Sequence, residues 1–122
     1  MNDLHLLTYP ASELQRTATQ PLQLGVQVSF DLTKEQVPIF VFAYSCENWV
    51  FYCKMLNSCL SVDVGWALTE LPKAWEQMVI AYQDLCDSPY LSRRVKKLNR
   101  LAFKKAKSRG RRWIRRAERS KS

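Results

Sequence analysis

The side chains with the clearest chemical use in this sequence are the basic ones near its C-terminal end. Residues 91–122 carry fifteen lysines and arginines and one acidic residue, Glu118. Lysine and arginine bind the phosphates of a nucleic acid, and the counterions that each contact releases favour the complex. We therefore expect DNA or RNA to bind this segment. The residues expected to contact it are Arg93, Arg94, Lys96, Lys97, Arg100, Lys104, Lys105, Lys107, Arg109, Arg111, Arg112, Trp113, Arg115 and Arg116.

Trp113 is the one aromatic residue expected in this interface. It lies between two pairs of arginines, at 111–112 and 115–116. Arginine makes bidentate contacts with phosphates and stacks on flat rings. An indole between such arginines is able to stack on an unpaired base. Packing of the indole against the rest of the protein is the alternative, and the sequence does not separate the two.

Charge is distributed unevenly along the chain, whose net charge is +8. Residues 1–90 hold ten acidic and four basic residues, a net charge of −6, whereas residues 91–122 carry a net charge of +14. Such asymmetry is typical of a chain whose charged end is an interaction segment. The sequence therefore predicts an acidic body that carries a basic arm.

Two other partners fit the same charges. An anionic membrane would attract the basic arm, but the apolar face near Phe103, Trp113 and Ile114 is narrow, so the pattern disfavours a membrane. An acidic protein surface, or the body of a second copy of the chain, is the other alternative. In that case the protein would be an interaction module, such as an inhibitor or an assembly factor. Phosphate contacts carry no sequence information, so the pattern gives neither base preference nor a choice between DNA and RNA.

The residue patterns predict no catalytic residue, no metal site and no cofactor. The sequence contains no P-loop, no nucleophile elbow and no zinc-protease motif, and His5 is its single histidine. Its cysteines, at positions 46, 53, 59 and 86, form no CxxC pair, which disfavours zinc and is typical of free thiols in a reducing compartment. We therefore expect a non-enzymatic accessory or regulatory protein that binds nucleic acid.

The apolar segments bear on the location of the protein. The first ten residues, MNDLHLLTYP, have no basic start and no long apolar run, so no secretory signal is expected. The most apolar stretch, residues 37–60, includes Glu47 and Lys54 and is too polar to span a bilayer. The predicted location is the cytoplasm, or the nucleus if the source is eukaryotic.

Three segments show patterns typical of β-strands. Apolar and polar residues alternate strictly over residues 21–32, which predicts a half-buried strand. Residues 37–44, VPIFVFAY, are rich in β-forming side chains and are expected to pair with it as a hairpin. A helix that begins at Thr33 is the alternative, because Thr33 and Gln36 fit a capping box. Residues 60–68 alternate again and predict a third strand.

Two helices complete the predicted body. The first follows Ser45, with apolar residues at helical spacing up to Leu60. The second is capped by Thr69 and ends before Pro89. The predicted fold class is α+β: a small three-stranded, mainly antiparallel sheet with two packed helices in the order β-β-α-β-α, followed by a basic C-terminal helix.

The predicted organisation has three parts: a loosely ordered segment 1–20, an acidic α+β body 21–90 and a basic helical arm 91–122. The arm is expected to be partly disordered when free, because like charges at i,i+4 repel. Gly110 predicts a break or hinge in its helix, and residues 91–103, which have larger apolar side chains, are expected to dock on the body. The stripe expected to face the body is Leu91, Val95, Leu98, Ala102 and Ala106.

Overall fold

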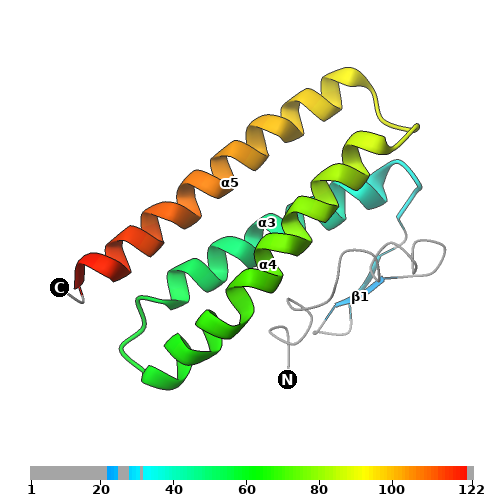
Figure 1. Ribbon diagram of the computed structural model, residues 1–122. Coiled ribbons are helices and arrows are strands. Elements are labelled where there is room, and N and C mark those ends of the chain that lie inside the picture. Colours follow the sequence, from blue (N-terminus) through cyan, green and yellow to red (C-terminus); the bar gives the residue numbers. More distant parts are fainter. Residues whose placement is uncertain (1–21, 25–27, 31, 121–122) are drawn as a thin grey trace.

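The computed structural model describes residues 22–24, 28–30 and 32–120. Within these ranges the fold is built from three helices (Figure 1), which are α3 (Gln36–Met55), α4 (Ser61–Asp87) and α5 (Arg93–Ser120). The chain runs down α3, back up α4 and down again along α5. The helix α3 contacts both of the others, whereas α4 and α5 touch each other little. The protein is therefore all-α.

The predicted three-stranded sheet is wrong. The described strands are β1 (Leu22–Leu24) and β2 (Val28–Phe30), which pair antiparallel with Leu22 opposite Phe30. Both lie inside the segment predicted as one strand, and they are too short to form a layer of the fold. The prediction for residues 1–20 lies outside the described residues.

Residues 37–44, predicted as a strand, form the first turns of α3. A capping box starts this helix. The backbone N–H of Gln36 donates to Thr33 Oγ1 at 3.3 Å, and the backbone N–H of Thr33 donates to Gln36 Oε1 at 3.1 Å. Pro38 falls in the first turn, where its missing N–H leaves no helical bond unmade. The alternative that the capping box predicted is therefore the one that forms.

The helix α3 forms the centre of the fold, which explains why its sequence shows no narrow apolar stripe. More than half of its residues are buried, and they lie on several sides of the helix. A helix that is apolar all round is a buried one, so burial against two neighbours outweighs the β-propensity of its side chains. Its buried residues are Val37, Pro38, Val41, Phe42, Ser45, Cys46, Asn48, Trp49, Val50, Tyr52 and Cys53.

Residues 60–68, predicted as the third strand, instead form the start of α4, which begins at Ser61. The alternating set does not form a buried face, since Leu60, Val62 and Leu68 are all more than half exposed. The helix buries Ala67 and Ala74 instead, seven residues apart, against the end of α3. The helix α4 continues through Pro72 and ends at Asp87, directly before the predicted stop at Ser88-Pro89.

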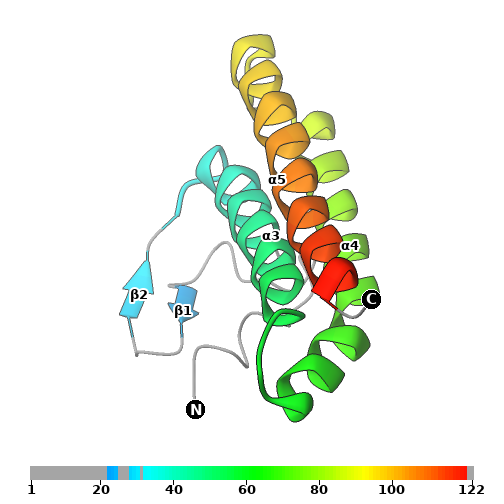
Figure 2. The ribbon, with the colours of Figure 1, turned by 90° about the vertical axis from the view of Figure 1, so that its left-hand side faces the viewer.

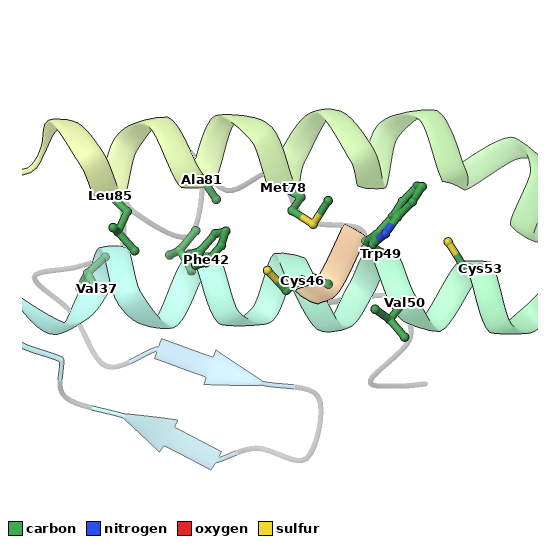
Figure 3. Close-up of a cluster of buried hydrophobic side chains, with 11 residues drawn as sticks. Val37, Phe42, Cys46, Trp49, Val50, Cys53, Met78, Ala81 and Leu85 are labelled. Carbon is green, nitrogen blue, oxygen red and sulfur yellow. The ribbon is translucent and has the colours of Figure 1, made fainter. Parts of the chain in front are cut away.

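Two hydrophobic clusters join α3 and α4 over most of their length. Figure 3 shows Phe42 and Trp49 of α3 directed toward Met78, Ala81 and Leu85 of α4. These α4 residues recur at three- and four-residue spacing, and all three are fully buried. The pairing of α3 with α4 therefore supplies a platform against which the third helix packs.

A cluster of aromatic rings connects all three helices near the start of α5. Phe42 of α3 lies 5.5 Å from Tyr82 of α4 and 5.8 Å from Phe103 of α5, measured between ring centroids. Tyr82 and Phe103 stack at 4.5 Å. Aromatic contacts of this kind add to the area that the rings bury. Phe103 thus attaches the basic helix to the core.

Candidate nucleic-acid interface

The helix α5 lies beside α3 (Figure 2), and its contact with the body is a narrow strip of small side chains. Ala106, Gly110 and Ala117 are its buried residues, and their spacing of four and seven places them on one side of the helix. The partly buried Phe103 and Ile114 extend the same strip. Small residues allow the two backbones to lie close together. Because the contact is confined to this strip, the rest of the α5 surface stays in solvent.

The predicted break at Gly110 is wrong, because α5 is continuous from Arg93 to Ser120. Gly110 faces Trp49 of α3, and a Cβ atom at this position would overlap the indole and lie 2.9 Å from Cys53 Sγ. The glycine is therefore required by close packing. Partial disorder of residues 91–122 in the free chain stays a prediction.

The stripe predicted to face the body is correct only in part: Ala106 is buried and Leu91 packs against the core, but two other members are exposed. Leu98 is 57% exposed, and Ala102 is exposed as well. Phe103, directed into the ring cluster, and Gly110, against Trp49, set the rotation of α5 about its own axis. This rotation places Leu98 on the solvent side of the helix.

The predicted basic residues lie on that solvent side. Eleven of the thirteen are exposed, and only Lys96 and Lys107 are half-buried. Lys107 Nζ lies 4.2 Å from the centroid of the Phe103 ring, so its stem covers the aromatic cluster. The structure therefore brings the predicted bases together on one helix, as a cationic face opposite the strip that packs on α3.

A groove in the C-terminal half of α5 gathers four arginines around Trp113. It has a volume of about 610 Å³, and it is lined by Arg109, Arg112, Trp113, Arg116 and Arg119. We call it the arginine groove. The arginines are spaced by three, four and three residues, so their guanidinium groups follow about 15 Å of one helix face. Arg119 was not among the predicted residues, although this spacing in the sequence continues to it.

Trp113 is half-buried and forms the aromatic part of the arginine groove. Its ring packs partly against the core, and its centroid lies 5.3 Å from Arg116 Cζ and 5.7 Å from Lys54 Nζ. Its backbone carbonyl accepts a hydrogen bond of 3.0 Å from Asn57 Nδ2 in the loop after α3. The ring is thus held in place while part of it stays accessible.

A second groove adjoins the first on the side of the α3–α4 loop. It has a volume of about 700 Å³, and Trp113 and Arg116 line it as well. Its other walls include Lys54, Asn57 and Asp63. A ligand able to reach Trp113 therefore finds cationic side chains on both sides of the indole.

The described residues offer little for metal or thiol chemistry. No group of three or more His, Cys, Asp or Glu side chains in this part of the chain is placed to hold a metal ion. Burial raises the pKa of Cys53 to about 12, and burial together with the nearby Glu47 carboxylate raises the pKa of Cys46 to about 12. Both are therefore uncharged thiols at neutral pH. Cys59 is exposed and Cys86 half-buried, and neither forms a disulfide.

Comparison of the chain with protein-family models, with characterised proteins and with solved structures found no match. Within the described ranges, no helix is both long and apolar enough to cross a membrane. The residues that the sequence offered for insertion into a membrane surface, Phe103, Trp113 and Ile114, all pack against the core.

Proposed function

We propose that this protein binds nucleic acid through the cationic face of α5 and acts as a non-enzymatic accessory or regulatory factor. The supporting observation is the placement of the bases: twelve exposed lysines and arginines lie on the solvent side of a single helix. Neutralisation of phosphates by such side chains releases counterions and favours binding to any sequence.

The packing of α5 supports this proposal. The helix is about 42 Å long, and its like charges repel one another along the surface. Contacts at Phe103, Gly110 and Ala117 hold these charges in one array in spite of that repulsion. A prearranged array loses less conformational freedom on binding than a flexible tail does. Bound phosphates would then reduce the repulsion between the basic side chains of α5.

Base readout by α5 is expected to be weak. A major groove about 12 Å wide admits a whole α-helix. Between Phe103 and Ala117 the inner face of α5 is covered by the body, so only its outer side is free to approach a duplex. Contacts there are made mainly with phosphates, which position a protein without selecting a sequence.

The salt dependence of binding tests this proposal. Full-length protein is titrated into fluorescently labelled duplex DNA, single-stranded DNA and RNA between 50 and 200 mM salt. Six to ten phosphate contacts would lower the affinity by about 10³ to 10⁵ over this range. An affinity that barely changes would contradict the proposal.

A pair of charge-neutralising variants locates the contacts. Arg112→Gln with Arg115→Gln removes two exposed bases from α5 and should make the salt slope shallower by about two. Lys34→Gln with Lys73→Gln removes the same charge outside α5 and should leave the slope unchanged. Equal effects from the two variants would show that net charge alone, and not α5, is responsible.

A second candidate function, binding of an acidic protein partner, is favoured by a different observation. Leu98 and Leu101 are 57% and 56% exposed among the bases of α5, and phosphate contacts do not use such side chains. Pulldown with and without nuclease separates the candidates. A partner that survives nuclease treatment and is lost from the Leu98→Gln, Leu101→Gln variant would favour this function.

A further inference from the structure

The arginine groove combines four arginines of the cationic face with one aromatic wall, the Trp113 indole. Elsewhere on α5, Lys107 and Arg111 lie over the rings of Phe103 and Trp75, which pack against the core, and the exposed apolar side chains are the aliphatic Leu98 and Leu101. In the groove, Arg109, Arg112, Arg116 and Arg119 surround the indole of Trp113. Binding of phosphates alone does not require an aromatic side chain. The combination of arginines and an indole therefore fits a ligand that has both phosphates and flat rings.

The dimensions of the groove fit such a ligand. Small-molecule sites have volumes of about 300–1,000 Å³, and the arginine groove has about 610 Å³. Its guanidinium groups follow the helix over about 15 Å, which exceeds the length of one base. Several consecutive nucleotides would therefore be needed to occupy it.

The surroundings of Trp113 fit a stacking role. Arg116 already lies near the ring, with Cζ 5.3 Å from its centroid, and the ring also borders the groove beside the α3–α4 loop. Arginine stacks on aromatic planes and binds phosphates with the same group. Because Arg116 lies over the indole, a base that stacks on this face of the ring would displace the guanidinium toward its own phosphate or stack on it.

We infer that the arginine groove binds an unpaired stretch of nucleic acid, with one base stacked on Trp113 and the adjacent phosphates held by Arg109, Arg112 and Arg119. This inference rests on the proposed function and adds the class of nucleic acid. Proteins that bind single strands combine a cationic groove with aromatic stacking platforms. A base inside a duplex is already stacked on its neighbours and would first have to be extruded, which disfavours duplexes at this groove.

The test compares single strands with duplexes. Dissociation constants of full-length protein are measured for labelled single-stranded DNA, single-stranded RNA and duplex DNA of equal length. Trp113→Leu keeps an apolar side chain against the core and removes the ring. It should weaken binding to single strands about tenfold to 100-fold and binding to the duplex less than threefold. Trp113→Phe, which keeps a ring, should lose much less, and Trp66→Leu is the control for loss of an indole on another helix.

A second pair of variants does not depend on the packing of Trp113. Arg109→Gln with Arg112→Gln neutralises two bases of the groove and should weaken binding to single strands more than binding to the duplex. Arg93→Gln with Arg94→Gln, at the other end of α5, should weaken both to the same extent. Comparison of the DNA and RNA strands then shows which of the two the groove prefers.

The outcomes separate this inference from the proposed function. Salt-dependent binding with no preference for single strands, and with equal effects from both arginine pairs, would overturn the inference and leave the proposed function standing. The absence of binding to any nucleic acid would overturn both. A preference for single strands that is lost in Trp113→Leu and largely kept in Trp113→Phe would support the inference.

Discussion

The helices α3 and α5 run side by side, yet they differ strongly in the fraction of their residues that is buried. Eleven of the twenty residues of α3 are buried, whereas α5 buries three of its twenty-eight. The residues of α3 are therefore chosen largely by contact with neighbouring helices. Those of α5 are chosen by packing only along one strip, which leaves most of its surface free for charged side chains that do not help the chain to fold.

This difference identifies the part of the molecule where function is to be sought. A cationic face on one helix is unfavourable for folding, because like charges at i,i+4 destabilise a helix by a few tenths of a kcal/mol per pair. The aromatic and small residues that attach α5 to α3 compensate for this repulsion. Predictions that compare the two helices test whether they fold as one unit.

The largest effect on stability is expected from shortening Phe42, a side chain of the aromatic cluster that connects the three helices. Phe42 is 1% exposed and contacts rings of both other helices. Phe42→Ala should lower the free energy of unfolding by about 3–5 kcal/mol, since it removes a large buried side chain and leaves a cavity. Leu98→Ala in the exposed part of α5 should change it by less than about 0.5 kcal/mol. Urea denaturation followed by circular dichroism measures both, and similar losses would contradict the contrast between the helices.

The next effect concerns the contact between α3 and α5. Gly110→Ala should destabilise the protein by about 1–3 kcal/mol, because the added methyl group overlaps the Trp49 indole and overpacks the contact. Gly65 in α4 is the matched control, since an added Cβ there meets nothing within 4 Å. Gly65→Ala should stabilise the protein by up to about 1 kcal/mol, as expected for a solvent-exposed helix position. Thermal unfolding of the two variants should therefore shift in opposite directions.

The smallest of these effects tests whether α5 unfolds together with α3. Ser92 caps α5, and its Oγ accepts a hydrogen bond of 3.2 Å from the backbone N–H of Val95. Ser92→Ala should lower the free energy of unfolding by about 1 kcal/mol. Ser108→Ala, at an exposed position inside the same helix, should be neutral or slightly stabilising. If Ser92→Ala leaves global unfolding unchanged, α5 frays separately from the core, as the sequence predicts for the free arm.

Some features of the fold could be predicted from the sequence and others could not. The end of α4 before Pro89 and the capping box at Thr33 are local signals, and both predict what forms. The strands over 37–44 and 60–68 were predicted from β-propensity and alternation. Those patterns do not indicate a strand where a helix is buried against neighbours on several sides, as at 37–44. They also fail where the alternating apolar residues are exposed, as Leu60 and Val62 are.

The candidate interface shows the same limit. The concentration of bases in residues 91–122 is a property of composition, so it could be found without a structure. The side of the helix that carries them could not. The predicted stripe joined Ala106 to large residues such as Leu98, whereas the close contact with α3 buries Ala106 together with Gly110 and Ala117 and leaves Leu98 exposed. With that rotation known, Arg119 joins the arginine groove.

The bond from Asn57 to the backbone carbonyl of Trp113 has one more consequence. The acceptor is a main-chain atom, which is present whatever side chain occupies position 113. This hydrogen bond can therefore form in any variant at that position. A replacement at position 113 therefore loses the packing of the indole against the core but keeps this attachment of α5 to the loop after α3. A library of residues at 113, screened against oligonucleotides of different composition, would exploit the independence of this hydrogen bond from the side chain.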